Sequence, residues 1–204
     1  MRRFKPNIKK NIFITFLILV FIFVTNFYSE KIFNAKKESV LENTKIGGSF
    51  NLIDQDGKKF SSVSIKKFKV IYFGYTFCPD VCPFDILKLS NFFTKKRELK
   101  KYIQPIFISV DPERDKPEVV KNFLENFDEN IIGLTGSTSI INKTLKNFKV
   151  YKKKAGTDPL NKDYLIDHTA LFYILDENDN YVTHLGTKNF EEEMNIFLKN
   201  KKFF

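Results

Sequence analysis

The chain holds few of the residue types that usually build reactive or metal-binding sites. Its 204 residues include no tryptophan, and methionine, histidine and cysteine occur only twice each. The two methionines, Met1 and Met194, are too few for a methionine-rich metal site. No internal repeat or low-complexity block is present, which excludes a repeat architecture. The 24 phenylalanines are consistent with an AT-rich genome and indicate little about function.

Acidic residues are absent from the first 29 positions. Five of the basic residues behind the net charge of +10 lie there, at positions 2, 3, 5, 9 and 10. Without that segment the chain is only mildly basic, so its charge gives little support for nucleic-acid binding. The lysines between 143 and 154 are interpreted as a solvated face. The length and the 43% of apolar residues suit one domain plus an extra segment.

An uncharged run, Ile12–Tyr28, follows the basic residues. A basic flank before an apolar run of about 17 residues predicts a single-pass anchor in a bacterial inner membrane, with residues 1–11 in the cytoplasm. The bulky residues at 24–28 favour a retained anchor over a cleaved signal peptide. The C-terminal domain would then lie in the periplasm, where disulfides can form.

Residues 29–46 are interpreted as a polar tether and residues 47–204 as one folded domain. Apolar runs predict a hairpin and several strands, at 50–60, 69–75, 106–110, 131–134 and two within 164–185. Helical spacing and capping residues predict helices at 84–99, 115–127, 138–148 and 190–199. Asp115 is the expected N-cap of the second helix. The alternation predicts an α/β fold whose sheet is parallel at its centre.

Cys78 and Cys82 lie four positions apart, directly after the predicted strand at 69–75. Ligand sites in α/β sheets lie beyond the carboxyl ends of such strands. Two cysteines there fit a local disulfide, a redox-active dithiol or a metal site. A disulfide would close a very short loop and stabilise little. The usual redox motif has two intervening residues, whereas this one has three.

If Cys82 lies in the first turn of the next helix, the positive helix end should lower its thiol pKa. Residues four apart on a helix have Cβ atoms about 5–6 Å apart, so both sulfurs could reach one metal ion. Pro79 and Pro83 would stiffen the loop. A metal needs a further ligand, and the two histidines are His168 and His184. Taken alone, each histidine is more simply interpreted as structural.

Three ordered blocks resemble the Sco/SenC family of copper-binding, thioredoxin-fold assembly proteins, from about Gly47 to the C-terminus. They are Cys78-Pro79-Asp80-Val81-Cys82-Pro83, Val110-Asp111-Pro112-Glu113-Arg114-Asp115 and Asp167-His168-Thr169. The basic N-terminus and single anchor are also similar. The resemblance implies a thioredoxin-like fold with a mixed central sheet. In it, a strand beginning near Thr169 runs antiparallel to 69–75 and brings His168 to the cysteines.

The resemblance implies that Cys78, Cys82 and His168 bind copper, as Cu(I) or Cu(II). This ligand set suits soft copper, although zinc would accept it too. Asp80 and Asp167 are candidates to accept a hydrogen bond from the ligating histidine or to act on it through charge.

The function implied is a membrane-anchored copper chaperone that serves cytochrome c oxidase subunit II, without substrate turnover. A copper-donor chaperone and a thiol reductant would be its other partners. The alternative is a thiol–disulfide reductase that uses Cys78 and Cys82 on exported proteins and does not need His168.

Overall fold

The computed structural model describes residues 21–22, 24–25, 27–29, 45–155 and 164–203. The chain divides into two compact units, Met1–Lys45 and Ile46–Phe204. In the first unit, the described residues between 21 and 29 are helical. Most of the predicted anchor and of the tether lies outside the described residues. Within the described ranges, no helix has the length and apolar character needed to cross a bilayer.

The second unit alternates strands and helices. Its strands are β1 (Asn51–Asp54), β2 (Lys59–Ser61), β3 (Phe68–Gly74), β4 (Ile103–Ser109), β5 (Ile132–Thr135), β6 (Lys152–Ala155), β7 (Leu165–His168), β8 (Leu171–Leu175) and β9 (Tyr181–Gly186). Its α-helices are α2 (Val81–Lys95), α3 (Pro117–Leu124), α4 (Thr138–Asn147) and α5 (Phe190–Asn200). Short 3₁₀ turns, η1 (Ser62–Ser64) and η2 (Arg97–Lys101), complete it.

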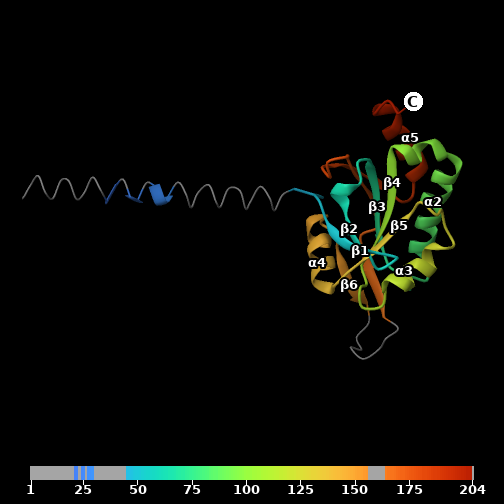
Figure 1. Ribbon diagram of the computed structural model, residues 1–204, viewed down its shortest axis with the longest axis horizontal. Coiled ribbons are helices and arrows are strands. Elements are labelled where there is room, and N and C mark those ends of the chain that lie inside the picture. The colour runs from blue at the N-terminus through green and yellow to red at the C-terminus, as the bar shows by residue number, and fades with distance from the viewer. Residues whose placement is uncertain (1–20, 23, 26, 30–44, 156–163, 204) are drawn as a thin grey trace, which may run out of the picture. The chain divides into compact units, whose positions relative to one another are not determined.

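Seven of these strands form one mixed sheet in the order β2-β1-β5-β4-β3-β8-β9 (Figure 1). Strands β3, β4 and β5 are parallel, whereas β8 runs antiparallel to β3. Residues 69–74 of β3 are all buried, as expected for a central strand with both faces covered. The α/β class and the mixed sheet predicted from the sequence are thus confirmed.

Neighbouring residues of β3 point to opposite faces of the sheet. Tyr72 contacts Asp85 of α2, whereas Phe73 packs against Phe148 at the end of α4, with ring centroids 5.1 Å apart. Figure 1 shows α2 and α4 on opposite sides of the sheet. The strands are therefore enclosed between helices, and β3 ends at the loop that carries the cysteines.

The predicted helix cap at Asp115 is wrong. Helix α3 begins at Pro117 and ends at Leu124, and Lys116 occupies the N-cap position without a side-chain bond to the helix. Asp115 is fully buried instead, and its carboxylate accepts hydrogen bonds from Thr76. The capping pattern was misleading because buried donors of another segment compete for the same carboxylate.

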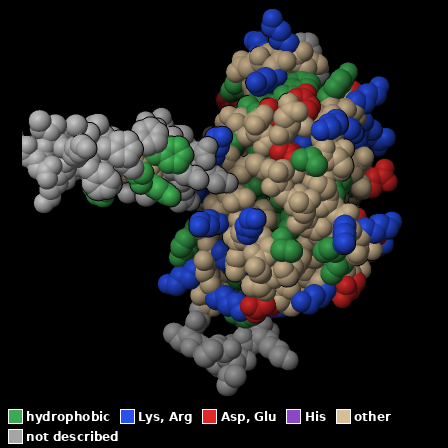
Figure 2. Space-filling view, turned by 60° about the vertical axis from the view of Figure 1, so that its left-hand side comes forward, with side chains coloured by type: hydrophobic (Ala, Val, Ile, Leu, Met, Phe, Trp, Pro, Cys, Tyr) green, Lys and Arg blue, Asp and Glu red, His purple; other side chains and the backbone are tan. Residues whose placement is uncertain are grey.

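Strand β6 was not predicted. Its lysines, Lys152, Lys153 and Lys154, pair antiparallel with β7 to form a separate two-stranded sheet. A strand of three lysines shows no apolar alternation, so periodicity could not reveal it. Over the face seen in Figure 2, basic side chains are spread widely, with fewer acidic ones between them.

Candidate metal centre

The centre of the site is a contact between a cysteine and a histidine that lie 86 positions apart. Cys82 lies in the first turn of α2, and His168 is the last residue of β7. The Cys82 Sγ and His168 Nε2 atoms are 3.2 Å apart. The structure therefore unites two of the three predicted metal ligands.

The sheet topology explains this meeting. Strand β3 ends at Gly74 and leads into the cysteine loop, while β8 begins at Leu171, at the same end of the sheet, because it runs antiparallel to β3. His168 lies three residues before β8. One detail differs from the expectation, since His168 does not start the strand beside β3 but ends β7, which pairs with β6.

The His168 ring is held in one orientation. Its Nδ1 atom lies 3.1 Å from the carbonyl oxygen of Thr169, and because a carbonyl only accepts, Nδ1 carries the proton. The rings of Tyr72 and Tyr75 meet the imidazole edge-on, with centroids 6.3 and 5.9 Å away. Burial lowers the pKa of His168. Nε2 is therefore a neutral lone-pair donor that faces Cys82.

The Cys82 thiol does not have the lowered pKa expected from the helix end. Burial raises the pKa of Cys82, and the neighbouring Cys78 raises it further. The backbone N–H of Tyr75 and the hydroxyl of Tyr72 act in the opposite direction but are outweighed. Desolvation of a fully buried thiol exceeds the modest stabilisation that a helix terminus gives a thiolate. Cys82 is thus a thiol at neutral pH.

Gly74 makes room for the Cys82 sulfur. A Cβ atom on this last residue of β3 would lie 3.2 Å from Cys82 Sγ, 2.8 Å from Tyr72 Cε1 and 3.0 Å from Phe107 Cε2. These contacts are shorter than ordinary van der Waals separations. The absence of a side chain at this position lets the sulfur pack directly against the sheet.

Cys78 lies in the loop between β3 and α2 and is half-buried, and both cysteines are free. Its backbone N–H donates to the Tyr75 carbonyl, 3.3 Å away. Because α2 begins only at Val81, the helical spacing assumed for the two cysteines does not apply. In the described part of the chain, no three His, Cys, Asp or Glu side chains already form a metal-binding group.

Asp80 and Asp167 are exposed, and the acceptor for the ligating ring is the Thr169 carbonyl instead. Asp167 points away because strand neighbours alternate between faces, so it acts on His168 only through a charge that raises its pKa. His184 lies outside the site. It is exposed on β9, and its Nδ1 is 2.5 Å from the Tyr181 hydroxyl.

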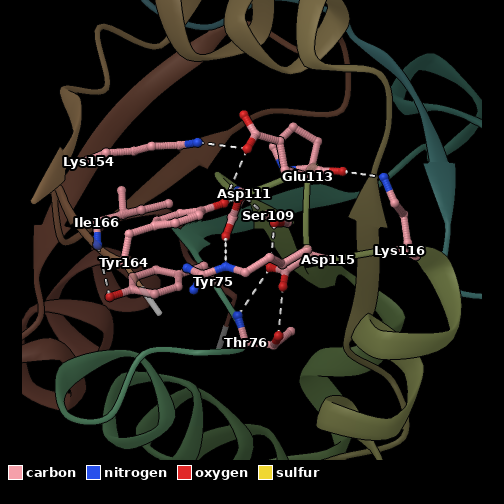
Figure 3. A network of polar contacts seen from close by, with 12 residues as sticks. Tyr75, Thr76, Ser109, Asp111, Glu113, Asp115, Lys116, Lys154, Tyr164 and Ile166 are labelled. Atoms are coloured by element: carbon pink, nitrogen blue, oxygen red, sulfur yellow. Dashed lines mark hydrogen bonds and ion pairs between the residues drawn. The ribbon is translucent and has the colours of Figure 1, made fainter. Parts of the chain in front are cut away.

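Sequence reasoning missed the buried polar network beneath the cysteine loop (Figure 3). Asp115 accepts hydrogen bonds from the Thr76 backbone N–H at 3.1 Å, the Thr76 hydroxyl at 2.6 Å and the Ser109 hydroxyl at 2.5 Å. Asp111 accepts from the Tyr164 hydroxyl at 2.7 Å. The block at 110–115 was the available signal, but the sequence alone assigned it no contact with the loop.

Comparison with known proteins points to one family. A family model described as SCO1/SenC matches residues 38–200. The SCO2-like protein RC0895 of Rickettsia conorii is 38% identical over 161 residues, which cover 78% of each chain.

Solved structures are similar as well. The chain resembles Bradyrhizobium japonicum ScoI with copper bound, with 42% identity, a TM-score of 0.68, and coverage of 76% of this chain and 98% of that one. It also resembles BsSco, described as having a disulfide switch and as a member of the Sco family of cytochrome c oxidase assembly proteins. There the identity is 28% and the TM-score 0.56, over 71% of this chain and 85% of that one.

Proposed function

Because this chain belongs to the SCO1/SenC family, we propose that it is a copper chaperone for cytochrome c oxidase, with Cys78, Cys82 and His168 as the copper ligands. The observation that carries the proposal is the contact between Cys82 Sγ and the unprotonated Nε2 of His168. A soft sulfur and a neutral imidazole nitrogen that lie next to each other are donors that copper prefers.

Copper would take the place of the Cys82 proton. Since Cys82 is a thiol at neutral pH and metal ligands must be deprotonated, binding releases a proton from the Cys82–His168 pair. The half-buried Cys78 already lies close enough to Cys82 to raise its pKa, and it would supply the third ligand. A ligand on a loop can also leave first, which gives an acceptor protein access to the ion.

The proposed cellular location and copper acceptor rest on the sequence and on the relatives. The basic residues before the apolar run at 12–28 support a single-pass anchor in the bacterial inner membrane, with the domain in the periplasm. The acceptor proposed there is the dinuclear copper site of cytochrome c oxidase subunit II. The relative BsSco, named for oxidase assembly, supports the oxidase as the partner.

Copper titration of the reduced full-length chain tests the proposal, with His168→Ala and the matched control His184→Ala. We expect His168→Ala to weaken copper binding at least about tenfold, as loss of one of three ligands should. His184→Ala should bind like the wild type, because His184 is exposed on β9 and its Nδ1 lies beside the Tyr181 hydroxyl, outside the site. Weak copper binding by the wild type, or equal affinity in His168→Ala, would refute the chaperone role.

The free thiols support a second candidate, a thiol–disulfide reductase. In that reaction Cys78 and Cys82 form a disulfide while the disulfide of an exported partner gains two electrons and two protons and becomes two thiols. Similarity to BsSco, which is described as having a disulfide switch, favours testing it. Copper-free His168→Ala should keep this activity if the reductase role is correct, because that role requires Cys78 and Cys82 and no metal ligand besides them.

A further inference from the structure

The segment Asp111–Asp115 contacts both arms of the proposed metal centre. One arm is the cysteine loop at the end of β3, and the other is the β6–β7 hairpin that ends in His168. Specific contacts between the two arms are needed to fix their relative position beyond what general packing provides. The segment supplies several such contacts to each arm (Figure 3).

Asp115 serves the cysteine loop. Among the described residues, its carboxylate accepts hydrogen bonds from Thr76 and Ser109, and Thr76 lies two residues before Cys78. The carboxylate is fully buried. These three hydrogen bonds of Asp115 fix the cysteine loop and do not involve the hairpin.

Arg114 serves the histidine arm. Its guanidinium lies 3.7 Å from the ring centroid of Tyr164, the residue that directly precedes β7. Asp111 connects the same two side chains, since it accepts from Arg114 Nε at 2.5 Å and from the Tyr164 hydroxyl at 2.7 Å. The Arg114 side chain is only 15% exposed, so the stack and the charge-assisted bond are little screened by water.

Two further contacts act on the same hairpin. Lys154 of β6 pairs with Glu113 at 2.7 Å, but both side chains are about half exposed, so the pair contributes little. The backbone N–H of Ile166 donates to the Tyr75 hydroxyl at 3.2 Å, which fixes the middle of β7. The Arg114 stack acts on Tyr164, directly before the first residue of β7, and Lys154 Nζ lies 4.2 Å from the centroid of the same ring.

We propose that Arg114 is a positioning residue of the metal centre. Its guanidinium, clamped between Asp111 and the Tyr164 ring, sets the position of β7 and thereby presents His168 Nε2 to Cys82. The inference rests on the proposed copper site. Lysine cannot replace arginine here, because an ammonium lacks the flat face that stacks on Tyr164 and the fork that also reaches Asp111.

The experiment compares Arg114→Lys with Arg97→Lys, which makes the same change at an exposed arginine of η2. We expect Arg114→Lys to weaken copper binding about tenfold, the lower range for loss of a group that orients a metal ligand, and Arg97→Lys to have no effect. Both changes are repeated in the His168→Ala background. There, Arg114→Lys should cause no further loss, because its effect passes through His168.

Arg114 also lies over Phe77, 4.9 Å from the ring centroid, so an effect through the cysteine loop is the competing explanation. Such an effect would persist in His168→Ala and would overturn the proposal, as would wild-type affinity in Arg114→Lys. If Arg114→Lys does not fold, Tyr164→Leu removes the same stack from the hairpin side and is judged by the same comparison.

Amide hydrogen exchange of the copper-free protein separates this inference from the copper function. Arg114→Lys should speed exchange at the β7 amides and leave α2 unchanged. If the wild type binds no copper, the chaperone function is refuted. Faster exchange at β7 in Arg114→Lys would still support the role of Arg114 in positioning β7. Unchanged exchange at β7, in a wild type that does bind copper, would refute the positioning role alone.

Discussion

Gly74→Ala should damage both the fold and the metal centre. The new methyl group would lie 2.8 and 3.0 Å from ring carbons of Tyr72 and Phe107 and 3.2 Å from Cys82 Sγ. Both rings are fully buried and cannot swing into solvent. The sulfur must therefore move away from the sheet, and its alignment with His168 Nε2 changes with it.

The expected magnitude follows from the crowding. Inserting a methyl group into a close-packed core costs about 1–3 kcal/mol. For a domain of this size, such a loss lowers the melting temperature of the copper-free protein by roughly 3–9 °C. Copper affinity should fall as well, by about tenfold, because one ligand is displaced relative to the other two.

Thermal unfolding and copper titration of Gly74→Ala measure both effects, with Gly136→Ala as the control. A Cβ atom at Gly136 would meet only Leu52 and Ile141, at ordinary separations of 3.6 and 4.0 Å. The control should keep the wild-type copper affinity. Should Gly74→Ala melt and bind copper like the control, the argument that Gly74 provides space for the sulfur is wrong.

Two predictions concern buried or paired carboxylates. Asp115→Ala should lower the free energy of unfolding by about 1–3 kcal/mol, because the donors of Thr76 and Ser109 lose their acceptor. Asp115→Asn should be nearly neutral, because the Thr76 hydroxyl can turn and accept from the new amide. Denaturant midpoints distinguish the two variants. Burial raises the pKa of Asp128, but bonds from Lys100 and other donors outweigh it and lower the pKa from 3.8 to about 2. Asp128→Asn should therefore lower the free energy of unfolding by roughly 1–2 kcal/mol at pH 7. The stability difference between variant and wild type should shrink as the pH falls from 3.8 to 2. A stability difference that does not change with pH would contradict this prediction.

The central sheet could be predicted because its strands depend on local pattern. The predicted strand at 69–75 contains the uninterrupted run Val-Ile-Tyr-Phe at 70–73, which is typical of a parallel strand covered on both faces, and β3 includes this run. Strand β6 could not be found in this way. Its three lysines gain their conformation from pairing with β7, a partner that local sequence does not reveal.

The site was less predictable than the fold, because its properties depend on burial. The residue pattern places Cys82 at a helix start, as observed, and this position alone predicts a lowered thiol pKa. The raised pKa results from the packing of Tyr72 and the sheet around the sulfur, which only the tertiary structure shows. Asp115 was misassigned for the same reason, since its partner Thr76 lies 39 positions earlier.

The contact between Cys82 and His168 spans 86 positions of the chain. A copper ion held there would act as a removable cross-link between α2 and β7 and would stabilise the folded state against global unfolding. Delivery of the ion would then cost the carrier part of its own stability. The copper-free protein would unfold more often than the copper-bound protein. Proteases that cleave unfolded chains would therefore degrade molecules that remain without copper.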